Sequence, residues 1–203
     1  MIAIIDYGMG NLRSVQAGFE HVGQKVFITD DPQKVLEADA VVLPGVGAFG
    51  DAITRLRETG LDIAFHESVK SGKPCIGICL GLQLLFSESE EGGLFKGLDI
   101  VSGKVIRFEN KLKVPHMGWN QLDIKKPDIP IFHNIPNGAF MYFVHSYYVK
   151  PEDDSVIAAS TDYGIEFTSV IAKDNLFATQ FHPEKSQKVG LQILYNFGSL
   201  VKG

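Results

Sequence analysis

Cysteine is scarce in this chain, which has only Cys75 and Cys79 among its 203 residues. Two cysteines four positions apart form neither a disulfide framework nor a zinc-binding set, so we expect no metal site. The sequence also lacks an apolar run of membrane-spanning length, and no basic region precedes its first apolar segment, residues 2–5. We therefore expect a cytoplasmic protein that does not bind a membrane and keeps both thiols reduced.

The chain also has fewer basic than acidic residues. The chain has 19 Lys and Arg against 24 Asp and Glu, a net charge of -5, which argues against nucleic-acid binding through a broad basic face. Repeats, low-complexity tracts and linkers are absent as well. Because 45% of the residues are hydrophobic, the chain can bury a sizeable core, and we expect a single domain over residues 1–203.

Short apolar runs alternate with helical patterns in the first half of the chain, which predicts an α/β fold. Near-continuous apolar strands separated by helices indicate a largely parallel central sheet covered by helices on both faces. After about residue 100 the strands are joined by short turns, so we expect antiparallel strands to be added in the C-terminal half. The predicted strands are residues 2–5, 26–28, 40–43, 75–78, 103–108, 139–144, 156–159, 166–172 and 177–181, with helices near 12–22 and 186–201.

The most informative segment is Gly77-Ile78-Cys79-Leu80-Gly81, where an apolar strand turns into an apolar helix. Glycines two positions before and after a reactive residue relieve crowding, so this pattern is typical of a nucleophile elbow with Cys79 at its tip. A helix N-terminus favours the thiolate, the form that attacks carbonyl groups. The segment therefore predicts acyl transfer through a thioester on Cys79, whereas Cys75 lies at the start of the strand and is expected to be a buried structural thiol.

A base and an orienting carboxylate occur together at Phe181-His182-Pro183-Glu184-Lys185. If residues 177–181 form a strand that Pro183 stops, His182 lies at the strand end and Glu184 just beyond it. A carboxylate at that place can fix the tautomer of the imidazole. We expect Cys79, His182 and Glu184 to form a catalytic triad.

The loop Pro44-Gly45-Val46-Gly47 follows the third predicted strand and is a candidate oxyanion hole. Glycine lets backbone N–H groups approach a ligand closely, and we expect the N–H groups of Leu80 and Gly47 to hold the developing charge. The loop could also be a simple strand-ending turn. A rival interpretation concerns Gly8-Met9-Gly10-Asn11, which resembles part of a nucleotide-binding loop, but Arg13 occupies the place of the third glycine.

Taken together, Pro44-Gly45-Val46-Gly47, the segment from Gly77 to Gln83 and His182-Pro183-Glu184-Lys185 resemble the triad-type, class I glutamine amidotransferases over nearly the whole chain. Two further segments, Pro115-His116-Met117-Gly118-Trp119-Asn120 and Tyr142-Phe143-Val144-His145-Ser146-Tyr147, closely resemble the glutaminase subunits of imidazole glycerol phosphate synthases. By that resemblance, Cys79 attacks the side-chain amide of L-glutamine, His182 transfers protons and Glu184 orients His182. Glutamate and ammonia are the implied products, and no cofactor is implied.

The resemblance also implies binding residues. The substrate residues are expected to be Gly45, Gln83, Glu91, Ser146 and Tyr147, with Glu91 facing the substrate ammonium. A TIM-barrel cyclase subunit is the implied partner in a heterodimer; it would use the ammonia to make imidazole glycerol phosphate and an aminoimidazole carboxamide ribonucleotide for histidine biosynthesis. The residues expected at that interface are His116, Met117, Trp119, Asn120, Tyr142 and Lys185, and the segment around Trp119 is interpreted as a loop.

Two functional alternatives stay open at this point. The chain could be the amidotransferase subunit of another synthase, such as one that makes anthranilate or aminodeoxychorismate. It could also be a Cys-His-Glu hydrolase that acts alone on peptides or γ-glutamyl compounds, in which case its activity would not depend on a partner.

Overall fold

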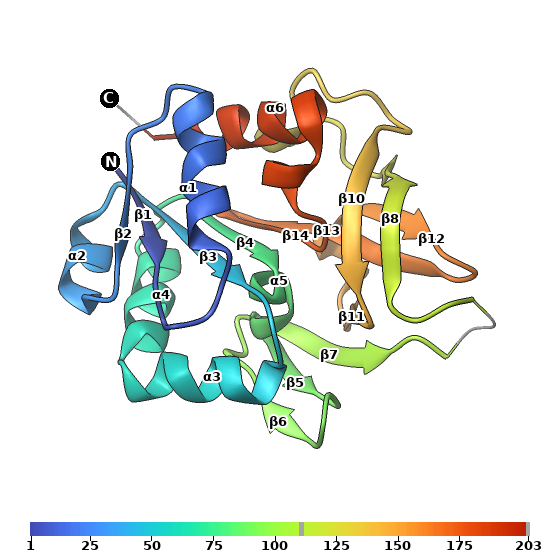
Figure 1. The fold of residues 1–203 in the computed structure, drawn as a ribbon, viewed down its shortest axis with the longest axis horizontal. Helices are drawn as coiled ribbons and strands as arrows, with labels where there is room; N and C mark the ends of the chain where they lie inside the picture. Colours follow the sequence, from blue (N-terminus) through green and yellow to red (C-terminus); the bar gives the residue numbers. More distant parts are fainter. Residues whose placement is uncertain (110–111, 202–203) are drawn as a thin grey trace.

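The computed structural model describes residues 1–109 and 112–201 (Figure 1). Its strands are β1 (Ile2–Ile5), β2 (Val26–Thr29), β3 (Ala40–Gly45), β4 (Cys75–Cys79), β5 (Phe86–Ser89), β6 (Phe95–Lys96), β7 (Val101–Arg107), β8 (His116–Gln121), β9 (Asp123–Ile124), β10 (Phe140–His145), β11 (Tyr147–Pro151), β12 (Ile157–Asp162), β13 (Glu166–Lys173) and β14 (Leu176–Thr179). The helices are α1 (Leu12–His21), α2 (Pro32–Glu37), α3 (Phe49–Glu58), α4 (Leu61–Lys70), α5 (Leu80–Leu84) and α6 (Gln187–Gly198), with short 3-10 turns η1 (Pro130–Phe132), η2 (Asp154–Val156) and η3 (Pro183–Lys185).

One large sheet forms the centre of the molecule, in the order β2-β1-β3-β4-β14-β13-β11-β7-β5-β6. The pairs from β2 to β14 are all parallel, and the pairs β14–β13, β13–β11 and β11–β7 are antiparallel. The predicted fold class is therefore confirmed, including the antiparallel strands contributed by the C-terminal half. β14 pairs directly with β4, so strands from the N-terminal and C-terminal halves of the chain meet in the middle of the sheet.

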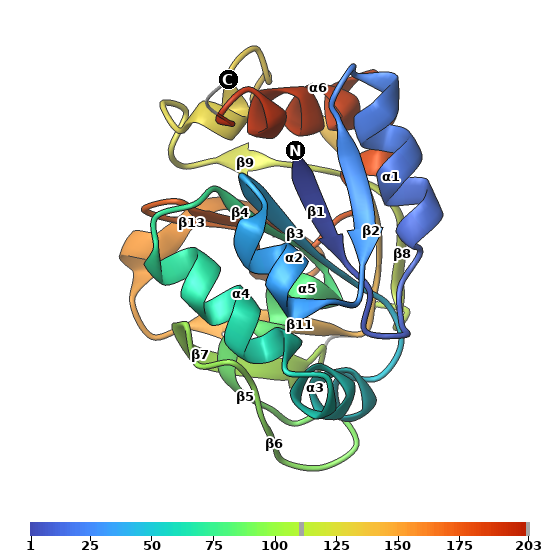
Figure 2. The ribbon, with the colours of Figure 1, turned by 90° about the vertical axis from the view of Figure 1, so that its left-hand side faces the viewer.

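Helices cover both faces of the parallel part of this sheet. Figures 1 and 2 show α1 and α6 above it and α3 and α4 below it. Phe19 of α1 and Phe197 of α6 are fully buried in one apolar cluster, where their rings meet edge to face. Phe49 of α3 and Phe65 of α4 belong to a second cluster on the opposite face. Strands such as β1 are therefore apolar at every position, because both of their faces are covered.

β8 and β10 form a separate antiparallel pair beside the main sheet, on the right in Figure 1. The interpretation of residues 115–120 as a loop was wrong, because His116–Gln121 is a strand. Its side chains alternate: His116 is buried, whereas Met117 and Trp119 are exposed. Weak apolar content and an internal glycine, Gly118, hide this period of two in the sequence.

The carboxyl ends of neighbouring strands meet at one edge of the sheet, and this edge brings the candidate site together. β3 ends at Gly45 beside Cys79, the last residue of β4. β14 ends at Thr179, three residues before His182. Open α/β sheets bind ligands at this edge. No helix within residues 1–109 and 112–201 is long and apolar enough to cross a membrane.

Candidate active site

Cys79 lies at the tip of a strained turn between β4 and α5. Its backbone has φ 56° and ψ -110°, a conformation that costs free energy for any residue other than glycine. A Cβ atom on Gly77 would lie 2.8 Å from the carbonyl oxygen of Gly81, and one on Gly81 would lie 1.9 Å from the carbonyl oxygen of Leu43. The chain can make this turn only because both flanking residues lack side chains.

His182 and Glu184 lie together just after β14. The Nδ1–H group of His182 donates a hydrogen bond of 2.9 Å to Oε1 of Glu184. The Glu184 side chain, carried by η3, is fully buried, and its Oε2 atom has no hydrogen-bond partner. Because Nδ1 is occupied by Glu184, the Nε2 side of the imidazole is the one available to Cys79.

The charge state of His182 follows from its surroundings. Burial by itself lowers the pKa of His182, but hydrogen bonds and charges from Cys79 and Glu184 outweigh burial and raise this pKa to about 10. The imidazole is therefore protonated at neutral pH. A protonated imidazole beside sulfur favours the thiolate and can give a proton to a leaving nitrogen.

Strand β10 fixes the backbone that carries this histidine. The N–H group of His182 donates to the carbonyl oxygen of Tyr142 at 3.0 Å. The Ser186 hydroxyl accepts the N–H of Tyr142 at 3.0 Å and donates to the carbonyl oxygen of His182 at 2.6 Å. The segment from His182 to Ser186 is thus bound to the outer pair of strands as well as to the main sheet.

A cavity of about 220 Å³ opens over Cys79. It is smaller than the roughly 300–1,000 Å³ of sites for drug-sized ligands, so it suits a small molecule. It brings together the expected nucleophile and base, both expected oxyanion residues, and three expected substrate residues, Gln83, Glu91 and Ser146. Gly45 and Tyr147 do not line it directly.

The family model of class I glutamine amidotransferases matches residues 3–199. The chain belongs to the class I glutamine amidotransferases. It is 58% identical, over 98% of its length and all of the relative, to the imidazole glycerol phosphate synthase subunit HisH of Syntrophotalea carbinolica. It is 52% identical to the HisH subunit of Methanosarcina barkeri, over 97% of this chain and 96% of that protein.

Solved structures of low identity agree on the fold. A crystal structure of a glutamine amidotransferase superposes with a TM-score of 0.77 at 16% identity, covering 99% of both chains. The structure of PurLQS from Thermotoga maritima gives a TM-score of 0.74 at 18% identity, covering 97% of this chain and 95% of that one. At identities this low, the solved structures show only that the fold is shared. The HisH subunits are more than half identical to this chain, and they show that it is related to the glutamine amidotransferases of that kind.

The loop that follows β3 approaches Cys79 in this amidotransferase. Gly45 ends β3, and a Cβ atom there would lie 2.7 Å from the hydroxyl of Tyr7 and 2.8 Å from Cβ of Leu80. Gly45 therefore supports the site by allowing close packing rather than by lining the cavity. Gly47 has φ 94°, a left-handed backbone conformation that favours glycine.

The expected substrate residues differ in the hydrogen bonds that their polar atoms already make within the protein. Oε2 of Glu91 accepts the N–H of Phe49 at 2.9 Å, and burial raises the pKa of this carboxyl while that hydrogen bond lowers it. Nε2 of Gln83 donates to the carbonyl oxygen of Tyr147 at 3.1 Å. The backbone carbonyl of Tyr147 therefore holds Gln83 in place. Ser146 lies between β10 and β11, on the wall of the cavity.

The expected interface residues divide into two groups. Met117 and Trp119 are 63% and 46% exposed, and the ring of Trp119 packs edge to face on Tyr142 with ring centroids 5.9 Å apart. Lys185 is exposed on η3. These side chains are available to a partner.

His116 and Asn120 need a correction as interface residues, because they lie on the inner face of β8. The His116 side chain is buried at 3% exposure and hydrogen-bonds to His145. Asn120 is half-buried and donates to His116 and to the carbonyl oxygen of Asp162. Their side chains face the interior of this amidotransferase because residues one or three positions from Met117 and Trp119 lie on the opposite face of the strand.

Three residues near the site were missed by sequence reasoning. His145 lines the cavity, and Gln180 is fully buried with Nε2 4.0 Å from Sγ of Cys79. The Tyr7 hydroxyl donates to the carbonyl oxygen of Pro44 at 2.9 Å, and burial together with the charge on Cys79 raises the pKa of Tyr7. Gln180 lies in the segment that leads into His182, which is the only local signal that could have marked it.

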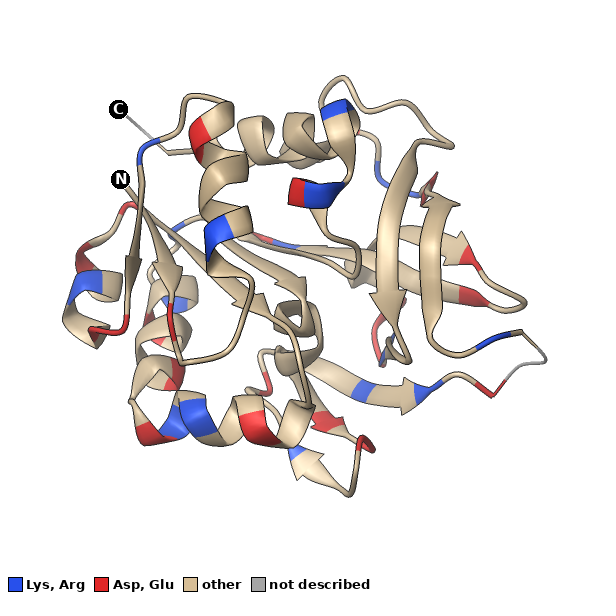
Figure 3. Cartoon of the chain, in the orientation of Figure 1, with Lys and Arg blue, Asp and Glu red and all other residues tan. Residues whose placement is uncertain are grey.

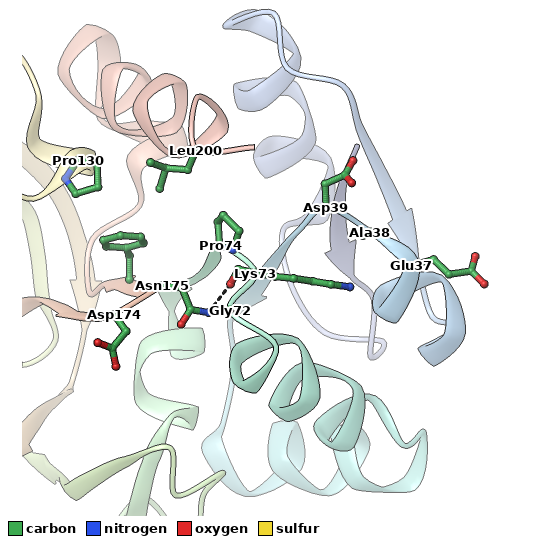
Figure 4. Close-up of a pocket in the computed structure, with 11 residues that line it drawn as sticks. Glu37, Ala38, Asp39, Gly72, Lys73, Pro74, Pro130, Asp174, Asn175 and Leu200 are labelled. Atoms are coloured by element: carbon green, nitrogen blue, oxygen red, sulfur yellow. Dashed lines mark hydrogen bonds between the residues drawn. The ribbon is translucent and has the colours of Figure 1, made fainter. Parts of the chain in front are cut away.

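A larger cavity of about 570 Å³ lies at the opposite edge of the sheet, near Pro74 and Asn175 (Figure 4). Two of its polar side chains are bonded within the protein: Asn175 donates to the carbonyl oxygens of Val69 and Lys73, and Nζ of Lys73 donates to that of Leu36. None of the residues that line it is a cysteine or a histidine, unlike those of the smaller cavity. Within the described ranges, no group of three or more His, Cys, Asp and Glu residues could hold a metal ion.

Proposed function

We propose that this amidotransferase is the glutaminase subunit of imidazole glycerol phosphate synthase and supplies ammonia for histidine biosynthesis. One observation supports this above all: a Cys-His-Glu arrangement surrounds a small cavity in a chain that is more than half identical to HisH subunits over nearly its full length. Residues 1–203 act as one glutaminase domain in this proposal, because β14 and α6 pack with β4 and α1.

The proposed reaction divides into two steps at Cys79. The thiolate Sγ attacks the side-chain amide carbon of L-glutamine, and the N–H groups of Leu80 and Gly47 hold the oxyanion. The carbon–nitrogen bond then breaks, and ammonia leaves with a proton from His182, which leaves a glutamyl thioester. His182 next takes a proton from water, which attacks the thioester, and glutamate leaves as the thiolate re-forms. The atoms balance with glutamine and water alone, so no cofactor is needed.

The residues that line the cavity bind the α-amino group and the other polar groups of glutamine in this proposal. Glu91 offers the carboxylate for the substrate ammonium, with its Oε2 atom already steadied by the helix N-terminus at Phe49. Gln83 and the backbone of Ser146 and Tyr147 contact the remaining polar groups of the substrate in this proposal. The charge of Glu91 would select an α-amino acid over a simple amide.

The outer face of β8 and β10 is the proposed docking surface for the partner, a TIM-barrel cyclase subunit. Met117, Trp119 and Phe140 are exposed there, and Figure 3 shows no Lys, Arg, Asp or Glu on either strand. The surface is continuous with the site, because Val144 lies opposite Met117 and also lines the cavity. A cyclase docked here could receive ammonia before it is protonated in water. A reducing cytoplasm is the compartment that suits a free catalytic thiol.

Replacement of Trp119 by alanine is expected to weaken assembly with the cyclase by about 2 kcal/mol, roughly thirtyfold in Kd, because exposed tryptophans at interface centres are common hot spots. Calorimetric titration of the two subunits measures this. Ile63→Ala is the matched control, since Ile63 is 66% exposed on α4, away from this surface. Equal Kd values for the Trp119 variant and the parent chain would remove Trp119 from the interface.

The proposed function is tested by glutamate release from glutamine. The purified chain is assayed alone, with the cyclase subunit, and with the cyclase and its ribonucleotide ligand. We expect strong stimulation in the complete mixture. Comparable turnover without the partner would favour a hydrolase that acts alone, and no turnover in any mixture would favour the subunit of a different synthase.

A further inference from the structure

A continuous path of hydrogen bonds runs from strand β8 to the cavity. Asn120 Nδ2 contacts Nε2 of His116 at 3.3 Å, and Nδ1 of His116 lies 2.9 Å from Nε2 of His145. Nδ1 of His145 lies 2.8 Å from the carbonyl oxygen of Tyr147. The catalytic steps proposed above use neither histidine.

The carbonyl at the end of the path decides where every proton lies. A carbonyl oxygen only accepts, so Nδ1 of His145 carries the proton and donates. In a neutral imidazole the other nitrogen then accepts, so Nε2 of His145 receives the Nδ1–H of His116. Nε2 of His116 is left as an acceptor for the amide of Asn120. The three side chains therefore donate in one direction, toward Tyr147.

Packing keeps both imidazoles neutral. The ring of His116 stacks between Tyr163 and Phe143, with ring centroids 4.0 and 4.9 Å away, and Phe167 meets the His145 ring at 5.1 Å. Burial lowers the pKa of His116 to about 4. Burial is also the main cause that lowers the pKa of His145 to about 3; the hydrogen bond to Tyr147 raises this pKa, and smaller contributions from His116 and His182 lower it.

The path continues beyond Tyr147 into the active site. The same carbonyl oxygen accepts a hydrogen bond from Nε2 of Gln83, and Nε2 of Gln83 also donates to Oε1 of Gln180 at 3.2 Å. Nε2 of Gln180 in turn points to Sγ of Cys79 at 4.0 Å. The side chains of Gln83 and Gln180 thus connect the histidine pair to the nucleophile through hydrogen bonds.

We propose that His116 and His145 are positioning residues for the glutaminase reaction, because they fix the Tyr147 carbonyl and through it Gln83 and Gln180 beside Cys79. This inference rests on the proposed function, since it concerns the same cavity. The histidine pair also connects the site to the docking surface: His116 and Met117 are neighbours on β8, one facing inward to the pair and the other outward to the partner. A shift of β8 on docking would move His116 and, through it, Gln83.

The first test reads the protons directly. Nitrogen-15 NMR of the histidine-labelled chain is expected to show His116 and His145 neutral at pH 6, each with its proton on Nδ1. His116→Phe should remove one set of signals and change the Nε2 shift of His145, because that nitrogen loses its donor. An Nε2–H tautomer on either ring, or protonation of either ring near pH 6.5, would overturn the path.

The second test measures the stimulated glutaminase reaction with saturating cyclase and ribonucleotide. His116→Phe keeps an aromatic ring between Tyr163 and Phe143 but cannot donate to Nε2 of His145. The His145 ring is then no longer fixed against the Tyr147 carbonyl, and Gln83 loses its ordered acceptor. We expect KM for glutamine to rise about tenfold while kcat changes less than about threefold. This pattern arises when a variant loses an interaction that stabilises the bound substrate and the transition state equally. His116→Asn places an amide donor where Nδ1 lies and should restore KM to within about threefold.

Phe167→Leu is the matched control, because it loosens the same aromatic cluster without removing any donor or acceptor. Its KM is expected to stay near that of the parent chain even if its melting temperature falls as much as that of His116→Phe. Equal increases in KM for His116→Phe and Phe167→Leu would show that the histidines act only through packing, which would contradict the positioning role. If the parent chain itself shows no stimulation, the proposed function fails, whereas a stimulated parent with an unaltered His116→Phe variant contradicts only the positioning role.

Discussion

Replacement of Cys79 by alanine is expected to lower glutamate release by at least about 10⁴-fold, to the background of the assay, because no other residue that lines the cavity carries a thiol. The fold should survive, since the side chain is small and lies at the cavity wall. Loss of the side chain also removes one of the two partners that raise the pKa of His182. The measurement is glutamate release in the complete mixture with cyclase and ribonucleotide.

Two comparisons make the Cys79 result specific. The complex should still use added ammonium salts at the parent rate, because the cyclase chemistry does not pass through this cysteine. Cys75→Ala is the matched control: Cys75 is fully buried at the other end of β4, and burial raises its pKa to about 12, so it is an unreactive thiol. Glutaminase activity retained by the Cys79 variant, or abolished in the Cys75 variant, would contradict the assignment of the nucleophile.

The features predicted well from the sequence are those that local chemistry determines. The elbow depends on Gly77 and Gly81, whose missing side chains are required within a few residues of Cys79. His182 and Glu184 are two positions apart, and their hydrogen bond needs only the turn that Pro183 begins. The central strands were predicted because burial on both faces makes each of them apolar throughout.

The features missed from the sequence depend on register between distant strands. His116 reaches His145 only because β8 and β10 pair with these two residues opposite each other. Neither segment alone shows whether a histidine points inward to a hydrogen-bonded pair or outward to a partner. Gln180 and Gln83 are 97 positions apart and meet because β14 pairs with β4. Such contacts follow from topology, which periodicity in one segment does not encode.

Replacement of Glu184 by glutamine is expected to lower stimulated turnover by about 10²- to 10⁴-fold, with the Cys79 nucleophile still present. Glutamine has nearly the shape of glutamate but no negative charge, so His182 keeps a neighbour without the charge that helps to raise its pKa. The glutamine amide would also lie where Oε2 has no partner, which leaves a buried donor unsatisfied. NMR titration of His182 should show its pKa falling from about 10 toward its ordinary value.

The same variant makes a prediction about stability and pH. His182 has a higher pKa in the folded chain than its ordinary value of 6.5, so its protonation stabilises the fold fully below about pH 6.5 and this contribution is lost as pH rises toward 10. The free energy of unfolding of the parent chain should therefore exceed that of the Glu184→Gln variant most near pH 6, and the difference should shrink as pH rises to 10. Denaturant titrations at several pH values measure this difference.

Glu58→Gln, at an exposed position of α3, is the matched control, and its free energy of unfolding should equal that of the parent chain at every pH. A difference that stays constant from pH 6 to pH 10 would show that Glu184 acts through packing, and would leave the protonation of His182 to Cys79 alone.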